Sequence, residues 1–266
     1  MFARLTTFLT IALALPSGAG AFEVSEAIRA ELRPGWREPD GRYVAALQIE
    51  LADGWKTYWR APGEAGIPPS FNWAGSTNLA GVEFRWPSPE VFDLGGIAAI
   101  GYKHELTLPM VITPQGDGPV TLDAAVELGI CSDICVPVSL RLSGRLDGAG
   151  APDAGIRAAL ERGPRSAAAA GVGAVRCTVE PLADGLRLSA DIAIPAQGKR
   201  ETVVVEFADR DVWVAPVESR RAGAQLLASA EMYRPDGQPF ALNREGVTIT
   251  ILGGDRAVEL AGCPAG

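Results

Sequence analysis

Apolar and polar residues alternate along much of the chain, which is the pattern of half-buried β-strands. In residues 43–51, every second residue from Leu47 onward is apolar, so these side chains fall on one face of a predicted strand. The same alternation returns in residues 121–130 and 136–142. A period of two that recurs from residue 22 to about residue 148 predicts a first domain built from sheets.

A loop-rich stretch separates these strands, from Asp53 to Gly101, and it concentrates tryptophan and proline. We expect most of its indole rings to cover the core of the domain under long loops. Direct contact of these rings with a partner protein is the other interpretation. The tryptophans concerned are Trp55, Trp59, Trp73 and Trp86.

One segment has the pattern of a helix. Residues 153–162 read DAGIRAALER, with Asp153 as the N-cap and Gly163-Pro164 as the stop. After a small, featureless run to Gly173, alternating strands return with turn residues between them, which suits an immunoglobulin-like sandwich. The strands expected there are residues 176–180, 186–192, 202–207, 225–232 and 247–252.

Length and composition agree with this reading. The chain has 266 residues, enough for two small domains, and its 31 glycines and 20 prolines favour turns and strands over long helices. We therefore predict an all-β fold. Two immunoglobulin-like β-sandwich domains, residues 22–148 and 174–266, are joined by a short helical linker at residues 149–173.

The first 21 residues have the composition of a secretory signal peptide. Arg4 supplies a short positive region, Phe8–Leu15 a brief apolar core, and Ala19-Gly20-Ala21 a small-residue cleavage site. No later run approaches about 18 apolar residues, so we expect an exported protein that does not span the membrane.

Charge and histidine content exclude several functions. The formal net charge is −8, so the protein would repel the phosphates of nucleic acid. His104 is the single histidine, which leaves little material for a Ser-His-Asp triad or a histidine-rich metal site. We expect no cofactor and no metal ion.

Four cysteines are present, Cys131, Cys135, Cys177 and Cys263. An even number in an oxidising compartment predicts disulfides, although the sequence allows three pairings. Cys177 and Cys263 lie near the two ends of the second domain. A bond between them would close a long loop, worth about 4 kcal/mol in the chain-entropy model, so we favour a structural disulfide over two free thiols.

The spacing C-S-D-I-C of Cys131 and Cys135 is different. A disulfide here closes only five residues and is worth about 2 kcal/mol, a weak structural reason for two cysteines. Because four residues of straight strand span about 13 Å, the chain between them must turn to bring them within bridging distance. Pro137 cannot donate to a ladder, so its strand should begin there or lie at a sheet edge. The pair is then a reversible dithiol, a plain hairpin disulfide or a two-thiolate Cu(I) site.

Four segments in order resemble the N-terminal periplasmic region of the transmembrane thiol:disulfide interchange reductases, the DsbD family, and in particular its ScsB-type branch. They are DGWKTYWRAPGEAGIPPSFNW at residues 53–73, WPSP at 86–89, GYKHELTLP at 101–109 and CSDICVP at 131–137. The resemblance covers most of the first domain and, more loosely, the linker and the second domain.

The resemblance implies an immunoglobulin-like domain with a redox dithiol, matched here by Cys131 and Cys135. By this likeness Cys135 forms the mixed disulfide with a partner and Cys131 resolves it. A cap loop shields the dithiol in the family, and it would fall at Phe92, Asp93 and Leu94, before Tyr102. Asp133, between the cysteines, would raise a neighbouring thiol pKa or accept a proton. No Lys or Arg lies in sequence between Lys103 and Arg141 to stabilise a thiolate.

We therefore predict a periplasmic thiol:disulfide interchange protein, a protein-disulfide reductase that passes electrons through Cys131 and Cys135. The family's membrane and thioredoxin-like domains do not follow in this sequence, which ends at Gly266. The expected partners are thus thioredoxin-like periplasmic proteins and a separate membrane electron donor. The alternative is a non-enzymatic interaction or copper-handling module with structural disulfides.

Overall fold

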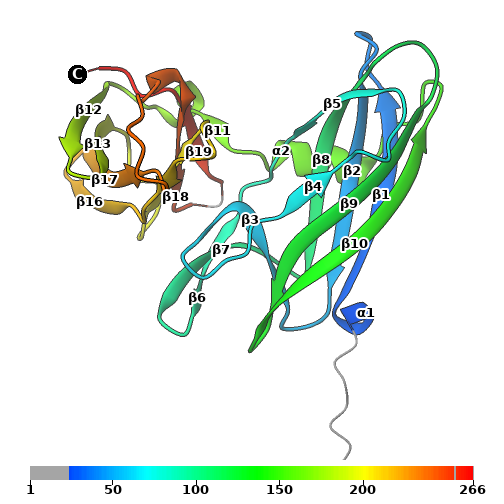
Figure 1. Ribbon diagram of the computed structural model, residues 1–266, viewed down its shortest axis with the longest axis horizontal. Helices are drawn as coiled ribbons and strands as arrows, with labels where there is room; N and C mark the ends of the chain where they lie inside the picture. The colour runs from blue at the N-terminus through cyan, green and yellow to red at the C-terminus, as the bar shows by residue number, and fades with distance from the viewer. Residues whose placement is uncertain (1–23, 255, 266) are drawn as a thin grey trace, which may run out of the picture.

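The computed structural model describes residues 24–254 and 256–265, and the described chain is built almost entirely from β-strands arranged in two bodies (Figure 1). The expected signal peptide, residues 1–21, lies outside the described residues. No helix among the described residues is long and apolar enough to cross a membrane.

The first body is a sandwich of two sheets. One sheet has the strand order β1-β2-β8-β5, and the other has the order β10-β9-β3-β7-β6, with β4 pairing with β9. The elements are α1 (Val24–Ala27), β1 (Ile28–Arg37), β2 (Tyr43–Leu51), β3 (Lys56–Gly63), β4 (Ser70–Asn72), β5 (Leu79–Phe84), β6 (Glu90–Leu94), β7 (Ile97–Lys103), β8 (Glu105–Pro114), β9 (Val120–Cys131) and β10 (Cys135–Leu146).

The strands predicted from strict alternation are present as β2, β9 and β10. Pro137 lies in β10, which is an edge strand, as its missing N–H requires. The prediction that residues 53–101 are mainly loops is wrong, because this stretch contains β3 to β7. In β3, Thr57, Tyr58 and Trp59 are all buried in succession, so the strand is covered on both faces and shows no alternation.

The tryptophans of this stretch lie in or against the core of the first sandwich. Trp59 and Trp86 are buried members of the core, and Trp55 and Trp73 pack against it while partly exposed. Their role as core cover agrees with the first of the two interpretations above.

The second body is a sandwich with the sheet orders β11-β19-β18-β14 and β12-β13-β17-β15, and β16 pairs with β17. All five strands expected there are present. Its elements are β11 (Arg165–Ser166), η1 (Ala168–Ala170), β12 (Val175–Leu182), β13 (Gly185–Ala193), β14 (Thr202–Phe207), β15 (Trp213–Val214), β16 (Glu218–Ala222), β17 (Gln225–Tyr233), η2 (Arg244–Gly246), β18 (Val247–Leu252) and β19 (Val258–Ala261).

The helix α2 (Ala154–Glu161) forms where the sequence predicts it, and Asp153 caps it by accepting a hydrogen bond of 2.9 Å from the N–H of Ile156. Ile156 is fully buried against Val44 and Ala46 of β2, so α2 packs on the first sandwich. The domain boundaries at residues 148 and 173 stay a prediction. Within the expected linker, β11 pairs with β19 and so joins a sheet of the second sandwich.

Candidate active site: a disulfide at a hairpin end

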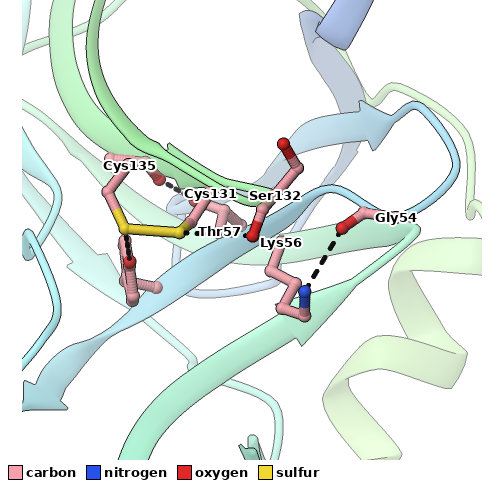
Figure 2. Close-up of a disulfide and its surroundings, with 8 residues drawn as sticks. Gly54, Lys56, Thr57, Cys131, Ser132 and Cys135 are labelled. Atoms are coloured by element: carbon pink, nitrogen blue, oxygen red, sulfur yellow. Dashed lines mark hydrogen bonds between the residues drawn. A yellow bond between two sulfur atoms is a disulfide. The ribbon is translucent and has the colours of Figure 1, made fainter. Parts of the chain in front are cut away.

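The short cysteine pair lies at the end of the longest hairpin of the first sandwich. Cys131 is the last residue of β9 and Cys135 the first of β10, and the two residues face each other in the ladder with Cα atoms 4.1 Å apart. The three residues between them turn, and the N–H of Ser132 donates to the carbonyl of Ile134 at 3.2 Å. The two sulfur atoms form a disulfide (Figure 2).

The two cysteines differ in exposure. Cys131 is 3% exposed, whereas Cys135 is exposed and follows Ile134, whose side chain is 66% exposed at the tip of the turn. Of the two cysteines, Cys135 is therefore the one that faces solvent. This asymmetry suits disulfide exchange, in which one sulfur is attacked and the other leaves.

A tyrosine from β3 contacts the exposed sulfur. The hydroxyl oxygen of Tyr58 lies 3.1 Å from Sγ of Cys135, and because a disulfide sulfur carries no proton, the hydroxyl is the donor. Tyr58 is 1% exposed, and burial raises the pKa of its hydroxyl, which stays protonated at neutral pH. Sequence reasoning missed this residue, although it lies within the first of the four resembling segments.

The segment expected to form a cap is a β-hairpin rather than a loop. Strands β6 and β7 are joined by Gly95 and Gly96, both at positive φ, and Asp93 holds this turn by accepting a hydrogen bond of 2.7 Å from the N–H of Gly96. In Figure 1 the tips of the β6–β7 and β9–β10 hairpins lie at the same end of the first sandwich.

Phe92 is the residue of this hairpin that packs against the Cys131 side of the disulfide. Its ring is 7% exposed and forms a small apolar cluster with Tyr58, Ala99 and Cys131, and Leu94 packs against this cluster. Phe92 and Leu94 thus lie where the resemblance implies a cap, whereas Asp93 serves the turn of the hairpin.

Two lysines flank the cap ring. The Nζ atoms of Lys56 and Lys103 lie 5.9 Å and 5.6 Å from the centroid of Phe92, within the range of cation–π attraction. Lys56 is the ladder partner of Cys131, and its Nζ donates to the carbonyl of Gly54 at 3.2 Å (Figure 2). Local sequence suggested no cation beside the cysteines, because Lys56 is paired with Cys131 through the order of strands in the sheet.

Of the two other residues expected near the cysteine pair, Tyr102 lies elsewhere and Asp133 lies beside it. Tyr102 is part of the main core, where its hydroxyl donates to the carbonyl of Pro87 at 2.8 Å and its ring stacks on Trp86. Burial raises the pKa of Tyr102 well above its ordinary value. Asp133 is exposed in the turn between the cysteines.

The second disulfide has a different setting. Cys177 and Cys263, 86 residues apart, are each 1% exposed, and their Cα atoms are 5.6 Å apart. Nη1 of Arg244 donates to the backbone carbonyls of both residues, at 3.0 Å and 3.2 Å. A fully buried bond held on both sides is inaccessible to a partner's thiolate.

In the described part of the chain, no three His, Cys, Asp or Glu residues lie together in a way that could hold a metal ion. The single histidine, His104, is exposed in the turn between β7 and β8.

Comparisons with known proteins were made once this geometry was established. Residues 25–145 match the family model described as thiol:disulfide interchange protein DsbD, N-terminal. No curated protein matches the chain by sequence. The crystal structure of the N-terminal periplasmic domain of ScsB from Proteus mirabilis is 21% identical with a TM-score of 0.62, over 94% of this chain and 96% of that one.

This likeness to the ScsB domain shows a shared fold that extends over both sandwiches. The reduced N-terminal domain of DsbD from Neisseria meningitidis is 16% identical with a TM-score of 0.32, over 50% of this chain and 95% of that one.

Proposed function

We propose that the chain passes electrons to partner proteins through Cys131 and Cys135, because residues 25–145 match the family model of the DsbD N-terminal domain. The observation that carries this proposal is the asymmetry of the disulfide. Its Cys135 end is exposed and contacts Tyr58, and its Cys131 end is buried under Phe92. A purely structural disulfide does not require one cysteine to be exposed and the other to be buried.

The proposed reaction has two halves. A thiolate of the electron donor attacks Sγ of Cys135, the bond between the cysteines breaks, and the Cys131 thiolate leaves and takes up a proton. The donor's second thiolate then displaces Cys135, so the donor leaves as a disulfide and the pair becomes a dithiol. In the second half, the Cys135 thiolate attacks a partner's disulfide, and Cys131 resolves the mixed disulfide. Two electrons and two protons pass to the partner.

The partners and the compartment follow from the same proposal. We expect thioredoxin-like proteins as redox partners and a separate membrane protein as the electron donor. Residues 1–21 have the composition of an export signal, and the similar ScsB domain is described as periplasmic, both of which support a periplasmic location.

The test is a glutathione titration of the protein from residue 22 onward, with alkylation and mass spectrometry to follow each disulfide separately. We expect Cys131–Cys135 to be reduced at potentials well above about −300 mV while Cys177–Cys263 stays oxidised. If both disulfides resist reduction alike, the short one is structural and the chain is a non-enzymatic interaction module.

A variant with Cys131→Ser provides the functional control. It should trap a mixed disulfide between Cys135 and a thioredoxin-like partner whose own second cysteine is replaced by serine, because neither protein then has a thiol to resolve it. Cys135→Ser should trap far less, since its remaining sulfur is buried.

A further inference from the structure

Strand β3, which carries Tyr58, is held by the second sandwich through a cluster of charges. Arg60 follows Tyr58 by two residues, and its Nε and Nη2 donate to the two carboxylate oxygens of Glu206 on β14, each at 2.9 Å. Nη2 also donates to Glu259 on β19 at 2.6 Å. We call Arg60, Glu206 and Glu259 the Arg60 cluster. It joins the strand beneath the dithiol to two strands of the second sandwich.

The Arg60 cluster is partly shielded from water. The guanidinium lies over the ring of Trp59, with its carbon 4.5 Å from the ring centroid, and the side chain of Arg60 is 25% exposed. Burial alone would lower the pKa of Arg60, but its hydrogen bonds and charge attraction to Glu206 and Glu259 together raise it. Arg60 is therefore always charged. Because its Nε and Nη2 bind the two carboxylate oxygens of Glu206 side by side, the interaction also fixes the position of the Arg60 side chain.

The backbone pairing of β3 with β7 is interrupted at the point where Arg60 makes its contacts. Lys56, Thr57 and Tyr58 pair with β7, and the pairing resumes only at Gly63 after a shift in register. Tyr58 is thus the last residue of the regular ladder. The segment directly after it is held by the side chain of Arg60 rather than by a continuous ladder.

A second contact joins the second sandwich to Ser88, which lies two residues before the first strand of the cap hairpin. Oγ of Ser88 accepts a hydrogen bond of 2.9 Å from the N–H of Ala257, and the N–H of Ser88 donates to the carbonyl of Arg162 at 2.8 Å. Ser88 lies four residues before Phe92. The second sandwich therefore contacts the chain close to both side chains that cover the dithiol, Tyr58 and Phe92.

We infer that Arg60 is a positioning residue for the dithiol: through Glu206 and Glu259, the second sandwich holds Tyr58 against Cys135. This inference rests on the proposed redox function and assigns the second sandwich a part in it. When the pair is reduced, the Tyr58 hydroxyl donates to the Cys135 thiolate and lowers its pKa. Loss of the Arg60 cluster lets β3 shift and weakens this hydrogen bond.

The experiment measures the rate at which iodoacetamide alkylates Cys135 in the reduced full chain from residue 22, as a function of pH. In Arg60→Gln we expect the midpoint of the pH profile to rise by about half to one unit, which lowers the rate at pH 7 by roughly three- to tenfold. Arg60→Lys keeps the charge but loses the fork, so its midpoint should lie between those of the wild type and Arg60→Gln.

A double-mutant cycle separates positioning from general loosening of the fold. In the Tyr58→Phe background, Arg60→Gln should cause no further shift of the midpoint, because the hydrogen bond through which Arg60 acts is already absent. Additive shifts would overturn the inference. An unchanged midpoint in Arg60→Gln, with the wild-type pair reducible, would overturn it too.

Two further variants control the experiment. Arg187→Gln removes an exposed ion pair with Glu231 inside the second sandwich and should leave the midpoint unchanged. If Arg60→Gln does not fold, as judged by circular dichroism, Glu206→Gln keeps the Glu259 contact and should produce a smaller shift in the same direction; no shift there overturns the inference. Failure of the redox function itself would appear separately, as a wild-type Cys131–Cys135 bond that glutathione does not reduce.

Discussion

The hydroxyl of Tyr58 lies 3.1 Å from Sγ of Cys135, although the two residues are 77 positions apart in the sequence. The contact exists because β3 lies beside β9 in the sheet, with Lys56 paired to Cys131. A hydroxyl donor at this sulfur favours its thiolate form after reduction. Under the proposed function, Cys135 is the attacking thiol, and it is the exposed cysteine of the pair.

Replacing Tyr58 by Phe should therefore raise the pKa of Cys135 in the reduced protein by about one unit, since the hydrogen bond to the thiolate is worth about 1.4 kcal/mol or more. The measurement is the pH dependence of iodoacetamide alkylation. Tyr102→Phe is the matched control, because its hydroxyl contacts Pro87 in the core. That variant should lose about 1 kcal/mol of unfolding free energy and keep the wild-type alkylation profile.

Phe92→Ala should expose the disulfide to small reductants. Removing the ring opens the cluster around Cys131 and should cost about 3 kcal/mol or less, since the site lies near the surface and can partly collapse. We expect reduction by dithiothreitol to be several times faster than in the wild type. Val91 lies in the same hairpin and is 42% exposed, so Val91→Ala should change neither the free energy of unfolding nor the rate of reduction appreciably. Equal rates in the two variants would show that Phe92 does not shield the bond.

The two disulfides should contribute differently to stability. Replacing both Cys177 and Cys263 by Ala should lower the free energy of unfolding of the second sandwich by about 4 kcal/mol, because their bond closes a loop of more than 80 residues. Replacing both Cys131 and Cys135 by Ala should cost about 2 kcal/mol. Urea unfolding measures both values. A larger loss for the short pair than for the long one would indicate a structural role for the hairpin bond.

Asp153 should make the stability of the first sandwich depend on acid pH. The N–H of Ile156, followed by the charge of Arg33, holds the pKa of Asp153 below its ordinary value of 3.8. A lowered pKa in the folded state means that the stabilisation is complete above the unfolded value and is lost as the pH falls through the folded value.

The variant Asp153→Asn keeps a capping side chain but cannot ionise. Its stability relative to the wild type should be lower at pH 7 and should approach the wild-type value as the pH falls toward 3. Asp153→Ala should cost about 1 kcal/mol at pH 7 through loss of the cap. Thermal unfolding across this pH range measures both, and a difference that does not change with pH would contradict the assignment.

The sequence predicts strands most directly where one face is buried and the other is not, as in β14, which is found at its exact bounds. Strands β2 and β18 are also found at their exact bounds, although β2 is buried on both faces, with Val44 and Ala46 covered by Ile156. Strand β3 was missed because Tyr58 and Trp59 are buried on opposite faces. The sequence predicts the cap as a loop because Val91 and Ile97 are apolar although exposed, so the alternation of a half-buried strand is absent there.

The candidate site was predictable only in its local part. The spacing of Cys131 and Cys135 within one hairpin was enough to predict that they approach each other. The hydroxyl of Tyr58 contacts Cys135, and Lys56 pairs with Cys131, through the order of strands in the sheet, and no local pattern encodes that order. Tyr102 was expected near the pair from its place after the cap, but its side chain points into the core.

The separation of 199 positions between Arg60 and Glu259 also imposes an order on how the protein matures. A chain emerges N-terminus first and its domains fold as units, so the first sandwich is complete before β14 and β19 exist. The hairpin disulfide can close at that stage, since its cysteines are four residues apart. The bond between Cys177 and Cys263 must wait for β19, as must the Arg60 cluster. A nascent or truncated protein would thus carry an oxidised hairpin that lacks the Arg60 cluster, and β19, the last strand to be made, would complete the contacts that hold β3.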